Sequence, residues 1–219
     1  ALVLLSGSAL LIRSFMGLRG AKPGIDPHHL LVFETSMGGT AYDSTAKEER
    51  FGTQAVRRLE GLPGVEAATL TVMLPASGNG GIDLPFNIVG RVPPKGDQWN
   101  GDEQYRFISP HYFQAFKVPV VRGRTFSETD TGNAARVVII NEKMAAQYWP
   151  KQDPIGQLII LGKGLGPEFE DPPRQIVGVA GNVRETGVAD GEVGVMYVPQ
   201  SQVPEGLTKL ANGVIPLSW

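Results

Sequence analysis

The hydrophobic pattern of the chain begins with an uncharged run, Ala1 to Ile12, that ends at Arg13. A bilayer core of roughly 30 Å requires about 20 helical residues, so this run is too short to cross a membrane alone. We expect it to be the end of a transmembrane helix. The hydrophobic region of a signal peptide and a buried core helix are the alternatives. The basic residues Arg19 and Lys22 follow the run, and such flanks more often mark the cytoplasmic side.

The next pattern predicts a strand, a helix and a second strand. The β-rich run Leu30 to Ser36 (LLVFETS) predicts the first strand, and Val65 to Leu74 (VEAATLTVML) predicts the second. Thr45 and Glu48 form a capping box at the start of the helix between them, and Gly61 and Pro63 end it. The apolar residues of the helix share one face, which we expect to be buried: Phe51, Ala55, Leu59 and Leu62.

A strand-rich region with two short helices follows. We expect strands at Phe86 to Arg91, Tyr105 to Ile108, Arg136 to Ile140, Gln157 to Leu161, Gln175 to Val183 and Val195 to Val198. Ser109 and Pro110 start the first short helix, in which Phe113 and Phe116 face inward. Asn141 caps the second, which Pro150 ends and in which Met144, Ala145 and Tyr148 share one side. The segments Ala76 to Asp83, Pro93 to Gly101 and Lys163 to Pro173 are expected to be surface loops.

Composition excludes several classes of protein. The chain has 219 residues and is 42% hydrophobic, which is enough for a sizeable core in one domain or two small lobes. Its 20 basic and 22 acidic residues give a formal net charge of −2, so nothing indicates nucleic-acid binding. With no Cys, disulfides, thiolate metal sites and cysteine nucleophiles are excluded.

Candidate catalytic and metal-binding groups are scattered rather than clustered. His28 and His29 are adjacent, so in an extended chain they point to opposite faces, and surface positions explain them better than a metal site. His111 lies in a short helix with no nucleophile pattern near it. The carboxylates considered as an acid and base pair lack a suitable spacing: Glu128, Asp130 and Asp153. The sequence therefore predicts no catalytic residue and no metal site.

The glycine patterns do not predict nucleotide binding either. Gly162, Gly164 and Gly166 follow a strand, but no helix pattern comes after them, and no Ser or Thr follows Lys163 as a phosphate-binding loop requires. Gly178 and Gly181 lie within a β run, where a bulge or close packing of the sheet explains them. We expect no cofactor.

Five segments in order resemble one known family. They begin with RSFMGLRGAKPGIDPHHLLVFETSM and YRFISPHYFQAFKVPVVRGRTFSETDT, and continue with ARVVIINEKMAAQYWPKQDPIGQLIIL, RQIVGVAGNVRETGV and VGVMYVPQSQ. Together they resemble the MacB-like periplasmic core domain of bacterial ABC-transporter permeases, in the duplicated-permease branch, here truncated.

This resemblance implies an α+β fold. It is expected to contain a porter-like βαβ unit and an inserted strand-rich sabre-like subdomain, preceded by the end of a transmembrane helix. Residues 1–20 would be the end of that helix and a stalk, and residues 30–75 the first half of the porter-like subdomain. Residues 84–200 would be the sabre-like subdomain, and residues 201–219 would lead into a second porter half that is missing here.

The resemblance also implies a function. The domain would lie on the periplasmic side of the bacterial inner membrane and transmit ATPase-driven motion, for export or for lipoprotein or envelope transport. Its partners would be a cytoplasmic ABC ATPase subunit, reached through the missing membrane part, a second permease copy or half, and a periplasmic adaptor. The domain would not be an enzyme. A membrane-anchored extracytoplasmic module that binds a small ligand in a closed apolar pocket is the alternative.

Two exposed loops are the candidate surfaces for contact with a partner. The first contains Gly78, Asn79, Gly80 and Gly81, and the second surrounds Trp99. Trp99 and Trp149 themselves are expected to be core residues rather than part of a ligand pocket.

Overall fold

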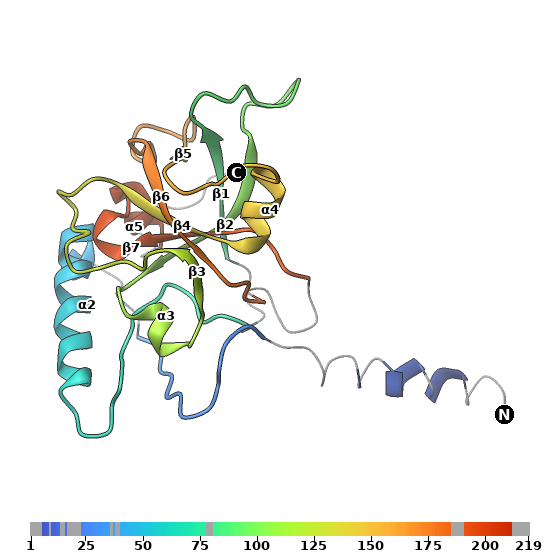
Figure 1. The fold of residues 1–219 in the computed structure, drawn as a ribbon. Helices are drawn as coiled ribbons and strands as arrows, with labels where there is room; N and C mark the ends of the chain where they lie inside the picture. Colours follow the sequence, from blue (N-terminus) through green and yellow to red (C-terminus); the bar gives the residue numbers. More distant parts are fainter. Residues whose placement is uncertain are drawn as a thin grey trace.

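Most of the protein is one strand-rich body with helices on its outside (Figure 1). The computed structural model describes residues 6–8, 10–13, 16, 23–35, 37, 40–77, 81–184 and 191–211. The sheet has seven strands: β1 (Ile82–Ile88), β2 (Gly101–Ile108), β3 (Val120–Gly123), β4 (Val137–Asn141), β5 (Leu158–Leu161), β6 (Arg174–Ala180) and β7 (Val195–Pro199). The strands expected after residue 84 are therefore confirmed, with ends shifted by a few residues, and β3 is an addition.

The sheet closes into a barrel. Its order is β3-β6-β4-β7-β2-β1-β5, and β5 also pairs with β6, so the path from β6 through β1 to β5 returns to its starting strand. Closure leaves β3 as an appended strand beside β6. Alternate residues of the barrel strands gather in one fully buried cluster, including Phe86, Tyr105, Ile140 and Met196. Since neighbouring strand residues point to opposite faces, this cluster fills the inside of the barrel.

A bulge in β6 explains the glycine noted in its sequence. The register of β6 against β4 shifts by one residue, from Val138 opposite Ile176 to Ile139 opposite Gly178. The extra residue reverses the alternation, and Ile176 and Val179 therefore both belong to the inner cluster. A β-carbon on Gly178 would collide with the carbonyl oxygen of Arg124. The sequence suggested a bulge or close packing of the sheet for Gly178, and the structure shows both.

Short helices cover the outer faces of the barrel. α3 (Tyr112–Ala115) begins after His111, and its residue Phe113 and its C-cap Phe116 are buried in a second cluster on the outside of β4 and β7. α4 (Glu142–Tyr148) starts at Asn141, whose side chain accepts a hydrogen bond of 3.0 Å from the backbone nitrogen of Met144. Both helices occur where the sequence predicts them.

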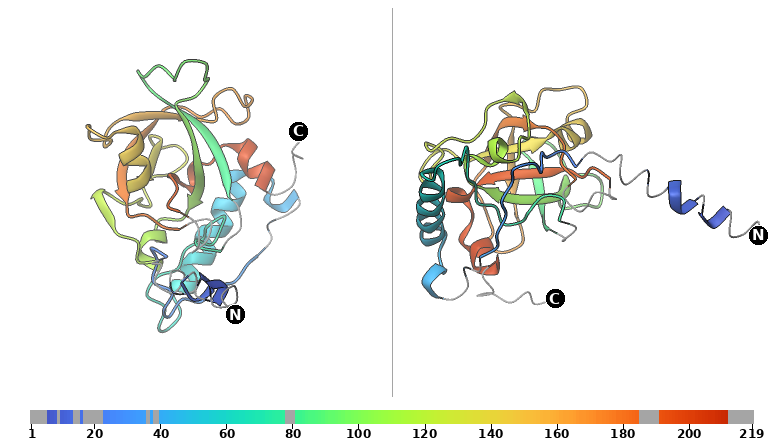
Figure 2. Two further views of the ribbon diagram at one scale, coloured as in Figure 1. Left: turned by 90° about the vertical axis from the view of Figure 1, so that its right-hand side faces the viewer. Right: turned by 90° about the horizontal axis from the view of Figure 1, so that it is seen from below.

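The long helix α2 (Thr45–Glu60) lies beside the barrel and packs against the segment that follows β7 (Figure 2). It is preceded by the short 3₁₀ helix η1 (Thr40–Tyr42), while η2 (Gln200–Gln202) and α5 (Glu205–Ala211) form its partner segment. Gly52 permits this contact, because a β-carbon there would lie 2.8 Å from Oε1 of Gln200. The sequence did not predict η2 or α5.

Two details of α2 differ from expectation. The N-cap is Ser44, which makes no side-chain capping bond, and the carboxylate of Glu205 instead accepts from the backbone nitrogen of Thr45 at 3.2 and 3.3 Å. The buried face consists of Thr45, Glu48, Gly52 and Val56, whereas Phe51, Ala55 and Leu59 are half-buried and Leu62 is exposed. The expected face was wrong because the helix is oriented by its contact with η2.

The two strands expected around α2 do not form. Residues 30–35 have no regular secondary structure, Ser36 lies outside the described residues, and Val65 to Leu74 contributes only an isolated bridge between Thr71 and Ile108. β2 is paired with β1 and β7 along most of its length, so only its last residues remain free to pair with this segment. The β-rich composition of both runs was therefore a poor guide, since a strand also needs an open neighbouring edge.

A buried polar network fixes η2 to the barrel. The guanidinium of Arg174 donates to Asp171, to the carbonyl oxygen of Val137 at 3.1 Å and to Oε1 of Gln202 at 3.1 Å. Gln202 in turn donates to the carbonyl oxygens of Thr131 and Ala135. Because each buried charge has partners, the network positions η2, and through it α2, firmly on the barrel.

Little of the first 20 residues is described. Residues 6–8, 10–13 and 16 have helical backbone conformation, and the side chains of Leu10 and Leu11 are exposed. Within the described ranges, no helix combines the length and hydrophobicity that a bilayer span requires.

Candidate partner-contact surface

The first predicted contact loop is only partly described. Gly78, Asn79 and Gly80 lie outside the described residues. Gly81 is half-buried directly before β1, and a β-carbon at this position would collide with the side chains of Arg106 and Gln104. Close packing against these side chains therefore explains Gly81, and its role in partner contact stays a prediction.

The second predicted loop, around Trp99, joins β1 to β2 and has a defined conformation. Oδ1 of Asn100 accepts from the backbone nitrogen of Ile88 at 2.8 Å, and the backbone nitrogen of Asn100 donates to Oδ1 of Asn87 at 3.1 Å. The indole nitrogen of Trp99 donates to the carbonyl oxygen of Lys163 at 2.8 Å, which joins this loop to the one after β5. These bonds join the two ends of the loop at its base and connect it to the loop after β5.

Trp99 is half-buried and forms the wall of a groove rather than part of the core. The expectation of a core position was wrong for this residue and right for Trp149, which is only 3% exposed. Trp149 packs in the buried cluster inside the barrel, whereas Trp99 lies in the loop that joins β1 to β2.

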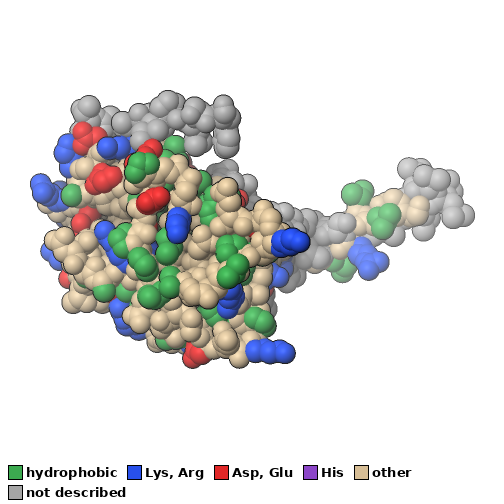
Figure 3. All heavy atoms as spheres, turned by 90° about the horizontal axis from the view of Figure 1, so that it is seen from above, with side chains coloured by type: hydrophobic (Ala, Val, Ile, Leu, Met, Phe, Trp, Pro, Cys, Tyr) green, Lys and Arg blue, Asp and Glu red, His purple; other side chains and the backbone are tan. Residues whose placement is uncertain are grey.

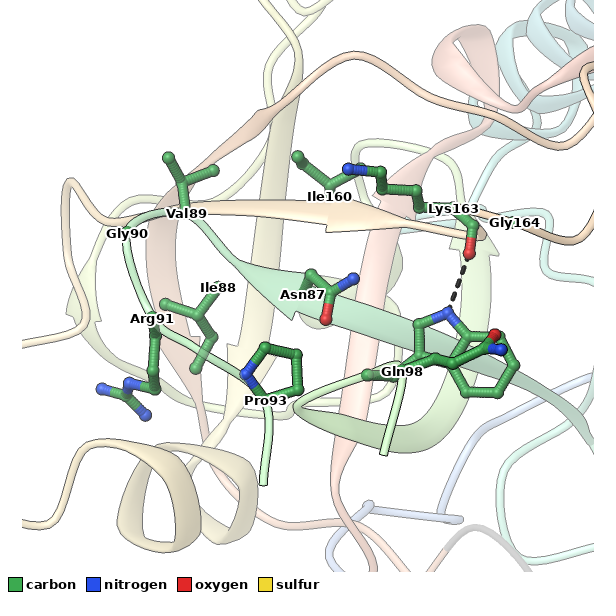
Figure 4. Close-up of a pocket in the computed structure, with 11 residues that line it drawn as sticks. Asn87, Ile88, Val89, Gly90, Arg91, Pro93, Gln98, Ile160, Lys163 and Gly164 are labelled. Carbon is green, nitrogen blue, oxygen red and sulfur yellow. Dashed lines mark hydrogen bonds between the residues drawn. The ribbon is translucent and has the colours of Figure 1, made fainter. Parts of the chain in front are cut away.

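The groove lies on the outer face of β1 and β5 and has a volume of about 500 Å³ (Figure 4). Asn87 and Ile160 are directly opposite each other in the β1–β5 ladder and contribute to its lining. Trp99, Pro93 and Val89 add apolar surface. Figure 3 views this end of the molecule from above and shows hydrophobic side chains lying among Lys and Arg.

The charged groups of the groove lining are cationic. Arg91 and Lys163 belong to the lining, and no carboxylate does. Arg91 donates to the carbonyl oxygen of Tyr148 at 2.6 Å, and its guanidinium carbon lies 5.6 Å from the ring centroid of Trp149. These contacts hold Arg91 at one end of the groove while its remaining donors stay exposed.

A second hollow lies on the other side of Trp99 and has the opposite charge. It is lined by Asp97 and Asp102 and by no cation. Burial, together with the nearby Asp83, raises the pKa of Asp102. Trp99 therefore separates a cationic groove from an acidic one.

A buried carboxyl supports the base of the loop. Burial raises the pKa of Glu103, although the hydrogen bond of 2.8 Å from the Tyr148 hydroxyl opposes that shift. Burial and the same carboxylate raise the pKa of Tyr148 well above its usual range. The pair is structural, since the Tyr148 ring also packs edge-on against Phe86 with centroids 4.9 Å apart.

Two of the three histidines considered in the sequence are paired with carboxylates, and the third, His29, is exposed. Nδ1 of His28 lies 2.8 Å from Oδ1 of Asp26, and Nδ1 of His111 lies 2.5 Å from Oε1 of Glu60. In the described part of the chain, no group of three or more His, Cys, Asp or Glu side chains is placed to hold a metal ion.

Each of the candidate carboxylates pairs with a different arginine. Asp130 accepts two hydrogen bonds from Arg124, of 2.7 and 2.9 Å. Burial raises the pKa of Asp130, but the bonds from Arg124 and Ser127 outweigh this and lower it overall. The other two form longer, exposed pairs: Glu128 with Arg57 at 3.5 Å and Asp153 with Arg122 at 3.4 Å.

Sequence reasoning missed several groove residues. Asn87 and Arg91 belong to β1 and the loop after it, whereas Ile160 and Lys163 belong to β5 and the loop after it, and only the folded barrel brings these two segments together. Asn87 was the detectable signal, because it is a polar residue between the apolar Phe86 and Ile88 of an otherwise buried strand and so must face outward. Both hollows beside Trp99 are open grooves.

Fold and surface together define an α+β domain built on a mixed barrel, with an aromatic groove at one end. The family model for the MacB-like periplasmic core domain matches residues 24–214. The chain therefore belongs to the family of MacB-like periplasmic core domains.

Named relatives match shorter parts of the chain. The pyoverdine export ATP-binding/permease protein PvdT of Pseudomonas syringae pv. syringae (strain B728a) is 37% identical over 84 residues, which are 38% of this chain and 11% of that protein. The ABC transporter permease YknZ of Bacillus subtilis (strain 168) is 30% identical over 92 residues, which are 42% of this chain and 21% of that protein. The matched segments are thus a small part of each relative.

Solved structures are more distant. The periplasmic region of MacB from Actinobacillus actinomycetemcomitans is 16% identical, with a TM-score of 0.45 and coverage of 69% of this chain and 56% of that one. The extracellular domain of the YknZ transporter from Gram-positive bacteria is 20% identical, with a TM-score of 0.39 and coverage of 81% of this chain and 74% of that one.

Proposed function

We propose that this chain is the extracytoplasmic domain through which an ABC-transporter permease transmits the motion of its ATPase across the bacterial inner membrane. The process served would be export, or lipoprotein or envelope transport. The observation that carries this proposal is the family match over residues 24–214. Relatives named as export ATP-binding/permease proteins support it.

The proposal includes partners outside this chain. A cytoplasmic ABC ATPase would act through the membrane part of the permease, and a second permease copy or half and a periplasmic adaptor would complete the assembly. Residues 1–20 would be the end of a membrane helix and its stalk, since the run Ala1 to Ile12 carries no charge.

The attachment of α2 to the barrel suits a domain that moves as one body. At the start of the helix, the Thr45 hydroxyl lies 2.6 Å from the Thr208 hydroxyl and donates to the carbonyl oxygen of Val203 at 3.2 Å. At its end, Glu60 contacts His111 and accepts from the backbone nitrogen of Ala68 at 3.2 Å. Both ends of α2 are thus bonded to other parts of the domain, which limits rotation of the helix during force transmission.

The proposed division of the domain also accounts for an exposed apolar segment. Leu31 is 86% exposed and Phe33 is 64% exposed, which is unusual for large apolar side chains in neighbouring positions. We propose that residues 30–75 belong to a porter-like unit and that residues 201–219 lead into a further half that covers this segment in the whole protein.

The experiment that tests the proposal uses the complete permease with its ATPase in bacterial membranes. A reporter fused after Gly20 should be located outside the cytoplasm. Replacing residues 24–211 by a short Gly/Ser linker should abolish export while ATP hydrolysis and membrane insertion persist. Cytoplasmic reporter activity, or export that continues without the domain, would contradict the proposal.

The proposed role is non-enzymatic, because the family is a transporter domain family. A small-ligand binding module would require an enclosing apolar pocket. Both hollows beside Trp99 are open grooves, so nothing in the described residues favours that alternative.

A further inference from the structure

The groove beside Trp99 has a floor that the strand pattern itself creates. Phe86 and Ile88 point into the barrel, so Asn87 between them points outward, directly opposite Ile160 of β5. Figure 4 shows the Asn87 amide in the centre of the groove. Its Oδ1 is occupied by the backbone of Asn100, which leaves the amide nitrogen facing the groove. The floor thus combines an apolar side chain with a hydrogen-bond donor.

The aromatic wall is already fixed without a ligand. The bond from the Trp99 indole to the carbonyl oxygen of Lys163 restrains the ring, and Asn100 anchors the adjacent backbone to Ile88 and Phe86. A large aromatic ring held in place loses little conformational entropy when a partner packs on it. Tryptophan and arginine are the side chains that most often dominate binding energy at protein interfaces.

The charged residues near Trp99 are divided by sign between the groove and the adjacent hollow. Arg91 and Lys163 are the charged lining residues of the groove, whereas Asp97 and Asp102 line the hollow beyond Trp99. A bound segment is therefore attracted if its acidic residues lie on the Lys163 side and repelled if they lie on the far side of Trp99.

We propose that this groove binds an extended segment of a partner protein, in which acidic residues precede or follow an apolar side chain that packs on Trp99. The inference deepens the proposed function, because it rests on the domain meeting other proteins outside the cytoplasm. The apolar side chain contacts Trp99 and Ile160, a backbone carbonyl accepts from Asn87, and the acidic residues meet Lys163 and Arg91.

The shape favours a protein segment over a small molecule, and the charge disfavours a lipid surface. Small-ligand sites usually enclose most of the ligand, whereas this groove is open along one side. An anionic membrane attracts Lys163 but repels Asp97 and Asp102, which lie on the same end of the protein.

The test measures fluorescence polarisation of labelled ten-residue peptides with the 219-residue chain in mild detergent. Three probes share two central Leu residues and differ in one flank, which carries Asp and Glu, Lys and Arg, or Ser and Gln. We expect saturable binding of the acidic probe, about tenfold tighter than either other probe and weakened by added salt. Trp99→Ala and Lys163→Glu should each weaken it about tenfold.

Matched variants separate recognition from folding. Lys95→Glu makes the same charge change at an exposed position of the β1–β2 loop that is outside the groove lining, and it should change binding less than twofold. Trp99→Phe keeps an aromatic ring, and it should bind better than Trp99→Ala. Thermal unfolding of each variant shows that the domain remains folded.

Three outcomes overturn the inference. They are equal binding of the acidic and basic probes, unchanged binding by a folded Trp99→Ala variant, and Lys163-dependent binding of phosphatidylglycerol vesicles without peptide binding. None of these measurements involves transport, so their failure leaves the proposed permease function standing, and loss of that function in cells does not bear on the peptide result.

Discussion

Two kinds of single residue are important for the fold of the domain. One is a glycine at which a β-carbon would collide with its neighbours, and the other is a charged side chain that is buried away from water. Gly178 allows β6 to bulge, and there a β-carbon would meet the carbonyl oxygen of Arg124 and lie 3.1 Å from Cγ1 of Ile139. Glu103 is the opposite case, a carboxyl group buried beneath the β1–β2 loop with the Tyr148 hydroxyl as donor. Both positions lead to measurable predictions.

Gly178→Ala should lower the free energy of unfolding by about 1–3 kcal/mol, because the added methyl group forces the backbone of β3 or β6 to shift. Gly191→Ala is the matched control, since a β-carbon at Gly191 would contact nothing within 4 Å. The control should change stability by less than about 0.5 kcal/mol. Urea unfolding measures both, and equal stability of the two variants would contradict the packing described for β6.

Glu103 should make the domain less stable as pH rises. Burial raises its pKa in the folded state, so the folded protein binds more protons than the unfolded chain, and stability falls from the ordinary Glu range up through the raised pKa. Glu103→Gln removes this titration. The stability of the variant relative to the native chain should therefore increase with pH, as measured by urea unfolding at acidic and neutral pH. A difference that stays constant or decreases would contradict the shift.

At the scale of elements, α2 is held by a cap that comes from a distant part of the chain. Glu205 occupies the N-terminus of the helix, where its charge also complements the helix dipole. The sequence predicted the position of α2 correctly. It predicted a local capping box instead of the cap by Glu205, because a contact between residues 160 positions apart leaves no local signal. The expected βαβ strands failed for a related reason, since strand pairing depends on which edges of the barrel remain open.

For the candidate site, too, the sequence predicts features that depend on neighbouring residues and misses contacts between distant segments. The loop around Trp99 was recognised from its polar, Gly-rich and Pro-rich composition, although Trp99 itself was wrongly expected in the core, and Asn141 was recognised from its position before a helical pattern. The groove around Trp99 was not, because Ile160 and Lys163 reach it only through the β1–β5 pairing. Local sequence patterns thus identified the strands after residue 84, and the closure of the barrel required the structure.

Thr45→Val should lower the free energy of unfolding by about 1–3 kcal/mol, since it removes the hydroxyl that contacts Thr208 and Val203 inside the domain. Hydrogen exchange should become faster at the start of α2 and in α5 together. Thr45→Ser keeps the hydroxyl and should retain slow exchange in both helices. Faster exchange in α2 alone would show that the two helices are not coupled through this contact.

At the scale of the whole molecule, the closed barrel and the helices fixed to it provide a stiff body, while Leu31 and Phe33 remain exposed beside it. A domain that transmits movement must be stiff, because a flexible domain would absorb the displacement. The proposed function assigns these exposed residues to a contact with a covering segment outside this chain.

Replacing Leu31 and Phe33 together by Ser should leave the thermal midpoint nearly unchanged and reduce light scattering of the isolated chain. Exposed apolar side chains contribute little to stability but promote association. The Val121→Ser variant, which changes a 45% exposed apolar residue on β3, serves as a control. A marked fall in the midpoint of the double variant would place these residues in the core instead.

If the domain passes movement from the membrane outward, it needs a rigid connection to the membrane part, which a tethered binding module does not. The most direct measurement is export by the complete transporter after insertion of a ten-residue Gly/Ser linker, which behaves as a flexible coil, between Gly20 and Ala21. The same linker inserted beside the exposed Gly191 is the control. We predict that the first insertion abolishes export while ATP hydrolysis persists, and that the control exports normally. Normal export with the flexible linker after Gly20 would contradict the account.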